Sequence, residues 1–273
     1  MINRIKLWKW ILLFVLSLVL GFIGLLGIQT LNSLVDSPLL TFFGAIVFIT
    51  LYAGAVRLIE KEPAKDIPLK SAAPHIGLGI LIGALYMGCV VAIISAMGCA
   101  HIEKCSFDLG NQLVALLLFF SVAVEEEILF RGILFRWIDN RWGLAPALIV
   151  SAIFFGAVHI IQPNASLWSC LAITIEAGVL LGAAYKWSGT LWLPIGIHWA
   201  WNYVQGDVFG IAVSGISDEP SFFKTVMHGP DIITGAEFGA EASVIAIILG
   251  GLLALWLLLS YNKKRKKMTI TIN

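Results

Sequence analysis

Long apolar stretches separated by short polar segments make up the hydropathy pattern of this chain. A hydrocarbon core of about 30 Å takes about 20 apolar residues per helix, and eight stretches approach that length. The predicted spans are Ile11 to Leu31, Leu39 to Leu58, His75 to Met97, Leu113 to Trp137, Ala145 to Ile161, Leu167 to Tyr185, Leu191 to Val204 and Ala242 to Leu259. The pattern therefore predicts an all-α polytopic membrane protein with about eight transmembrane helices.

Composition supports this class. Hydrophobic residues make up 59% of the 273 residues and charged residues 13%, and the mean hydropathy is +0.91. A soluble domain carries about 25% charged residues, so this chain has half the usual solubilising charge. No repeat, long polar segment or low-complexity linker interrupts it. We expect one integral membrane domain over residues 1–273.

The positions of the basic residues predict an orientation. If both termini are cytoplasmic, 15 of the 18 Lys and Arg residues fall on inner segments and two, Lys104 and Lys224, on outer ones. Such an excess of basic residues is typical of cytoplasmic segments. We therefore expect a multi-pass protein of the cell membrane with its N- and C-termini in the cytoplasm. The inner residues are Arg4, Lys6, Lys9, Arg57, Lys61, Lys65, Lys70, Arg136, Arg141, Lys186, Lys263, Lys264, Arg265, Lys266 and Lys267.

The fourth span contains three consecutive carboxylates, Glu125, Glu126 and Glu127, followed by Arg131. A charge inside a membrane helix is costly and marks a functional site by default. Glu127 and Arg131 are four residues apart, so they lie on one helix face and can form a buried ion pair. Glu126 then lies on a neighbouring face, beside the pair, where it is suited to proton transfer near neutral pH.

Two further spans carry histidines in a similar pattern. Phe155 and His159 are four residues apart in the fifth span, and His198 and Asn202 in the seventh. A rise of 1.5 Å per residue places Glu126 about 16 Å, His159 about 21 Å and His198 about 12 Å from the inner face. These depths are compatible with one chamber in the inner half of the membrane. Glu176 in the sixth span falls at a similar depth.

In this order, Glu126-Glu127-x-x-x-Arg131, Phe155-x-x-x-His159 and His198-x-x-x-Asn202 resemble the three motifs of the CPBP intramembrane endopeptidases. That family includes the type II CAAX prenyl proteases and bacterial proteins linked to bacteriocin processing or self-immunity. The resembling region, residues 113–204, is the expected catalytic core.

The resemblance implies a glutamate-dependent protease. Glu126 would be the general base that activates water, and His159 would position or share the proton. His198 and Asn202 would stabilise the oxyanion, while Glu127 and Arg131 would orient the site. The residues expected to support them are Phe155 and Glu176.

Other interpretations stay open at this point. Glu126, His159 and His198 are alternative ligands for zinc, although no H-E-x-x-H motif is present and no cofactor is the first expectation. A proton-coupled transporter or a catalytically silent membrane scaffold are the alternative functions. The expected partners are a membrane-tethered peptide or protein substrate, prenylated or leader-bearing, and the lipid bilayer, with no nucleic acid. Cys99 and Cys105 share a predicted outer loop, where an oxidising compartment would allow a disulfide.

Overall fold

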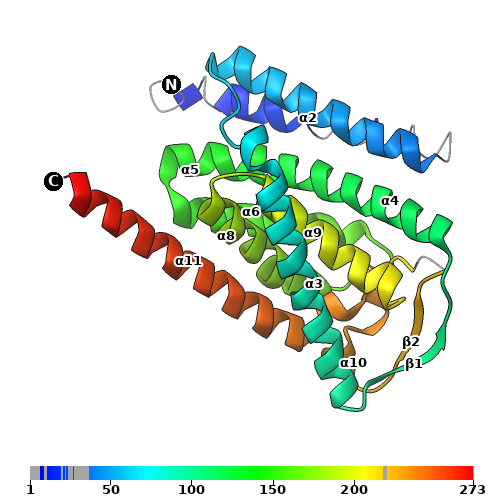
Figure 1. Ribbon diagram of the computed structural model, residues 1–273. Coiled ribbons are helices and arrows are strands. Elements are labelled where there is room, and N and C mark those ends of the chain that lie inside the picture. Colours follow the sequence, from blue (N-terminus) through cyan, green and yellow to red (C-terminus); the bar gives the residue numbers. More distant parts are fainter. Residues whose placement is uncertain are drawn as a thin grey trace.

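The computed structural model describes residues 7–8, 11–19, 21, 23, 27, 37–217 and 220–272. Most of the described chain is helical, as predicted (Figure 1). The longer helices are α2 (Pro38–Glu60), α3 (Ala72–Ala96), α4 (Leu109–Glu127), α6 (Leu144–Val158), α9 (Trp192–Tyr203) and α11 (Val244–Ile272). The shorter ones are α5 (Arg136–Trp142), α7 (Leu167–Ile173), α8 (Leu180–Ser188) and α10 (Asp231–Thr234).

Some helical segments have the wider π-helical turn. They are η3 (Ile128–Phe135) between α4 and α5, η5 (Thr174–Val179) between α7 and α8, and η6 (Val204–Val208) after α9. Single turns of 3₁₀-helix are η2 (Leu69–Ser71), η4 (His159–Ile161), η7 (Ala236–Phe238) and η8 (Ala240–Ala242).

Five helical stretches are long and apolar enough to cross a membrane within the described residues: Pro38–Glu60, Leu69–Ala96, Leu144–Ile161, Leu167–Ser188 and Val244–Lys266. The protein is therefore a multi-pass membrane protein. The predicted span Leu113 to Trp137 lies in the continuous helical segment 109–142, and Leu191 to Val204 largely in 192–208. Of the first predicted span, residues 11–19 are helical and most of the rest lies outside the described residues. The count of eight and the cytoplasmic termini stay predictions.

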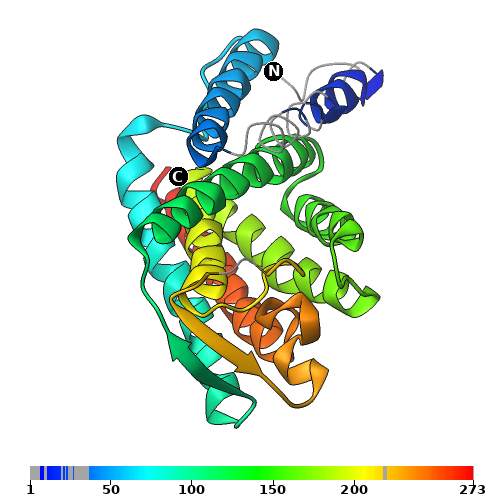
Figure 2. The same cartoon turned by 90° about the vertical axis from the view of Figure 1, so that its right-hand side faces the viewer.

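The expectation of an all-α protein was incomplete. Strands β1 (Ala100–Cys105) and β2 (Phe223–Met227) pair in an antiparallel two-stranded sheet outside the predicted spans. Figure 2 views the molecule from the side on which these strands lie in Figure 1. The pairing joins segments that are far apart in the sequence, so no local sequence pattern predicts it. Cys99 directly precedes the extended strand β1 and Cys105 is its last residue, so these two free thiols are too far apart for a disulfide.

Helices α3 and α9 pack at very short range because glycines face each other. A Cβ atom on Gly79 would lie 2.6 Å from the carbonyl oxygen of Leu193, and one on Gly83 would lie even closer to that of Ile197. On α9, a Cβ on Gly196 would lie 2.6 Å from the carbonyl oxygen of Ile76. Small residues allow membrane helices to approach in this way. The contact fixes the position of α9, which carries the second histidine motif.

A second close contact fixes α6 against η5. A Cβ on Gly178 would lie 2.7 Å from Cα of Ala152, and one on Gly156 would overlap Oγ1 of Thr174. The end of α6 and the backbone of η5 are thereby held beside each other. Both contribute to the region where the three motifs meet.

Candidate active site

A buried ion pair joins Glu127, the last residue of α4, to Arg131 in η3. Nη1 of Arg131 lies 2.7 Å from Oε1 of Glu127, and both side chains are fully buried. Nη2 of Arg131 also donates to the carbonyl oxygens of Ala177 and Gly178 at 3.2 Å each. The ion pair that the spacing predicts is present, and it ties α4 and η3 to η5.

The π-helical turns lie next to the motif residues. η3 contains Arg131, η5 supplies the two carbonyls that Arg131 contacts, and η6 begins shortly after Asn202. A π-helical turn inserts extra backbone into a helix, changes the direction of the side chains around it, and occurs often at functional sites. Nothing in the hydropathy pattern predicts where these turns form.

His198 is oriented by the same ion pair. Its Nδ1 lies 3.2 Å from Oε1 of Glu127. An ionised carboxylate only accepts hydrogen bonds, so Nδ1 is the donor and Nε2 is the ring nitrogen left for other partners. Nε2 lies 4.0 Å from Oε2 of Glu126, slightly beyond hydrogen-bond distance. Glu127 therefore aims the reactive side of His198 at Glu126.

His159, at the end of α6, is held in a comparable way. Its Nδ1 lies 2.7 Å from the carbonyl oxygen of Phe155, one turn earlier. A carbonyl oxygen only accepts, so Nδ1 again carries the proton and Nε2 is the free acceptor in the neutral ring. The ring of Phe155 lies among the charged groups, 5.0 Å from the ring of His159 and 6.1 Å from that of His198. The guanidinium of Arg131 stands 4.5 Å from the same ring, so Phe155 packs beside both histidines and the ion pair.

These elements surround a cavity of about 490 Å³. Four of the predicted residues line it together: Glu126, His159, His198 and Asn202. The side chain of Glu126 is 23% exposed and that of Glu127 is not exposed at all. Of the two adjacent carboxylates, Glu126 is therefore the one that water in the cavity can reach.

Glu125 and Glu176 lie away from the cavity. Glu125 is buried and is not among the residues that line it. Glu176 is fully buried behind the site, where Oε2 accepts a hydrogen bond of 2.8 Å from the hydroxyl of Tyr86. Trp201 stacks edgewise on Tyr86 and lies 6.0 Å from the ring of His198. Glu176 is thus linked to His198 through two aromatic rings.

The position of the cavity along the helices differs from the one that the depth estimate gave. The cavity lies at the end of the helices that carries the predicted outer loops, because its lining includes Asn111, Gln162, Asp207, Ser214 and Pro220. The depth estimate assumed straight helices crossing the whole membrane from fixed inner ends. In the structure α6 ends at Val158, so His159 stands at the end of its helix that leads into the predicted outer loop.

Sequence reasoning missed the turn formed by Val213 to Ile216, which covers one wall of the cavity. The buried carboxylate of Glu241 accepts hydrogen bonds from the backbone N–H of Ser214 at 2.6 Å and from its hydroxyl at 2.9 Å. Burial raises the pKa of Glu241 to about 7, while the hydrogen bonds from Ser214 act in the opposite direction. Neither residue stands in a motif. The acidic residues of segment 205–241 were the only sign in the sequence that this segment contributes to the site.

Within the described residues, no group of three or more His, Cys, Asp or Glu side chains is placed to hold a metal ion. Of the alternative zinc ligands, His198 already donates Nδ1–H to Glu127.

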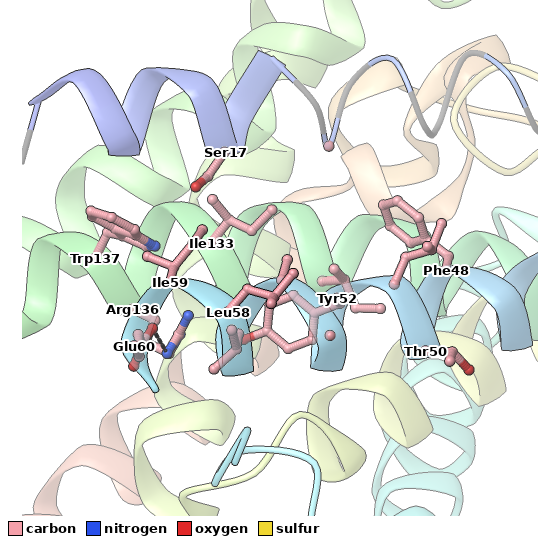
Figure 3. Close-up of a pocket in the computed structure, with 16 residues that line it drawn as sticks. Ser17, Phe48, Thr50, Tyr52, Leu58, Ile59, Glu60, Ile133, Arg136 and Trp137 are labelled. Carbon is pink, nitrogen blue, oxygen red and sulfur yellow. Dashed lines mark hydrogen bonds and ion pairs between the residues drawn. The ribbon is translucent and has the colours of Figure 1, made fainter. Parts of the chain in front are cut away.

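A second cavity of similar size is apolar and separate from the motifs. It lies between the helical residues 11–19, α2 and η3, and Phe48, Tyr52, Ile133 and Trp137 are among its lining residues (Figure 3). The ion pair of Glu60 with Arg136 closes one end. None of the predicted site residues lines this cavity, so it is not a candidate for the chemistry.

The comparisons with known proteins bear on the segment that builds the site. A search among curated proteins found no match. Residues 109–204 match the family model described as Type II CAAX prenyl endopeptidase Rce1-like. This range contains all three motifs and runs from the first residue of α4 to the first residue of η6. The resemblance predicted from the motifs is confirmed: this multi-pass membrane protein carries an Rce1-like domain, that of a family of membrane proteases.

Proposed function

We propose that the protein is an intramembrane endopeptidase in which Glu126 activates the attacking water. The observation that carries the proposal is the different environment of two adjacent carboxylates. Glu127 is fully buried and engaged by Arg131 and His198, whereas Glu126 reaches the cavity. A general base must reach both water and the substrate, and of these two carboxylates Glu126 meets that condition.

The reaction follows from this arrangement. Glu126 takes a proton from water as the water oxygen bonds to the carbonyl carbon of the scissile peptide. The carbonyl oxygen becomes an oxyanion, which the amide N–H of Asn202 and a protonated His198 stabilise. The proton then passes to the leaving nitrogen as the C–N bond breaks. His159 has its free Nε2 available to share that proton, because Nδ1 is engaged by Phe155.

The groups around the site hold its orientation. The carboxylate of Glu127 directs His198, and Arg131 neutralises that carboxylate where water does not reach it. The substrate that suits such a cavity is a membrane-tethered peptide or protein, held by a lipid or by its own helix. Whether it carries a prenyl group is an outcome of the test below.

The test is cleavage of a membrane-tethered peptide library by the purified protein in detergent. We expect Glu126→Gln to lose cleavage, because the amide cannot take a proton from water. The matched control is Glu125→Gln, which changes the adjacent carboxylate away from the cavity and should leave cleavage unchanged.

Three results would contradict parts of the proposal. Cleavage that persists in Glu126→Gln would remove the general base. Cleavage abolished by a chelator and restored by zinc would make His159 and His198 metal ligands. Proton-coupled solute uptake by the wild-type protein, without cleavage of any peptide, would favour a transporter.

A further inference from the structure

The polar rim of the active-site cavity comes from one end of the molecule. Asn111 lies in the first turn of α4, Gln162 follows η4, and Asp207 is in η6. Ser214 and Pro220 belong to the segment between η6 and β2. The sheet of β1 and β2 lies at this same end, since Ser106 donates its N–H to Phe222 and Phe222 donates to Asp207.

The opposite end gathers the basic segments. Arg136 pairs with Glu60 at 2.6 Å, and Lys186 pairs with Asp139. The ammonium of Lys264 lies 3.9 Å from the ring centroid of Trp187. These contacts join the end of α2, α5, the end of α8 and α11, which lie together on the left in Figure 1, away from β1 and β2 on the right. Four of the five predicted inner segments therefore meet at one end of the fold.

Together, the charge pattern and the fold indicate which side of the membrane the cavity faces. The excess of basic residues at one end is typical of the cytoplasmic side. The cavity opens at the other end. From this we infer that the active site faces the non-cytoplasmic side of the membrane, and that the scissile bond belongs to an exported segment of a membrane-anchored protein. The inference rests on the proposed protease function for its substrate, but the side on which the cavity opens does not depend on that function.

The chemistry of the rim suits such a substrate. Amide and hydroxyl groups of Asn111, Gln162 and Ser214 can bond to the backbone of an extended peptide, whereas the cavity in Figure 3 is lined mainly by apolar side chains. A peptide anchored in the outer leaflet by its own helix or by a lipid would present its polar segment at this depth. A C-terminal tail presented from the cytoplasm would meet the basic end instead.

Thiol labelling in intact cells tests the side directly. In the full-length chain, Cys89, Cys99, Cys105 and Cys170 are replaced by Ala, and Ile216→Cys places one thiol on the exposed part of the cavity wall. We expect a membrane-impermeant anionic maleimide to label this thiol in intact cells. The matched control is Asn140→Cys, exposed at the basic end, which should be labelled only in inverted vesicles.

A second labelled cysteine controls for misfolding of the Ile216→Cys variant. Native Cys105 is exposed at the end of β1, so a chain that keeps only this cysteine should give the pattern of Ile216→Cys. Labelling of either reporter only from the cytoplasmic side, with Asn140→Cys labelled from outside, would overturn the inference.

Substrate side is measured separately, with single-span reporter proteins that carry the cleaved sequence on one side of the membrane or the other. We expect cleavage of the exported sequence only, and its loss in Glu126→Gln. Cleavage of the cytoplasmic sequence alone would overturn the assignment of the substrate. Outside labelling of Ile216→Cys without cleavage of any reporter would support the opening and count against the protease itself.

Discussion

Adjacent glutamates in this protein have different surroundings. Successive residues of a helix point about 100° apart, so Glu126 and Glu127 face different neighbours. The side chain of Glu127 is fully buried and contacts Arg131 and His198, whereas the side chain of Glu126 is partly exposed to the cavity. The spacing of the motif predicts that the two carboxylates face different neighbours, but their difference in exposure comes from the surrounding helices.

Replacing Arg131 tests how much the buried ion pair stabilises the fold. Arg131→Met leaves the carboxylate of Glu127 buried without its cation, and breaking such a pair costs about 3–5 kcal/mol. We expect a correspondingly lower free energy of unfolding in detergent. The matched control is Lys65→Met, which breaks the exposed pair of Lys65 with Glu62 and should cause no measurable change. Equal effects of the two variants would contradict the importance of burial here.

Glu241 provides a prediction about pH. Because its pKa in the folded protein, about 7, exceeds the ordinary value of 4.5, the folded state keeps the proton to higher pH than the unfolded state does. Its stabilising contribution is therefore complete below pH 4.5 and is lost as pH rises through 7.

The variant Glu241→Gln keeps an acceptor for Ser214 but does not titrate. We expect its Tm to rise relative to that of the wild type as pH increases from about 5 to about 8. Thermal unfolding of both proteins across this range measures the difference. A constant difference in Tm would show that Glu241 does not titrate in this interval.

At the scale of elements, glycines set the distances between the helices that carry the site. Gly83 of α3 faces the carbonyl oxygen of Ile197, the residue before His198. A methyl group there forces the backbones of α3 and α9 apart, and overpacking of this kind costs about 1–3 kcal/mol. We expect Gly83→Ala to lower both the free energy of unfolding and the rate of cleavage.

The control for this variant lies on the same helix. A Cβ atom on Gly88 would have no described neighbour within 4 Å, so Gly88→Ala introduces no clash. Alanine favours the helix by up to about 1 kcal/mol over glycine, so this variant should be neutral or slightly more stable. If Gly83→Ala behaved like Gly88→Ala, the short contact between α3 and α9 would not position His198.

The π-helical turns are the part of the elements that sequence reasoning could not predict. Apolar periodicity indicates that a segment is helical, but it does not distinguish a regular turn from a wider one. In η3 and η5 the wider turns accompany the hydrogen bonds from Arg131 to Ala177 and Gly178, which are tertiary contacts. Their positions follow from packing and not from local preference.

At the scale of the whole molecule, the two ends differ in charge and in architecture. One end joins Glu60, Arg136, Asp139 and Lys186 through ion pairs, and the other carries the strands and the cavity. This difference places the candidate chemistry at a definite end of the protein. The charge pattern along the chain predicts the basic end, whereas the depth estimate placed the chamber nearer to that basic end than the cavity lies.

Composition, apolar runs and spacings of four residues act within one segment. They were therefore enough to predict the membrane class, most of the helical segments, the family resemblance and the pairing of Glu127 with Arg131. The packing of the helices brings Glu126, His159, His198 and Asn202 to one cavity. It also places Ser214, held by Glu241, in the cavity wall and sets the end of the molecule at which the cavity lies. These features depend on glycine contacts, π-helical turns and a sheet between distant segments. All three arise when the helices pack. Packing brings together residues that are far apart in the sequence, and no local sequence pattern predicts such contacts.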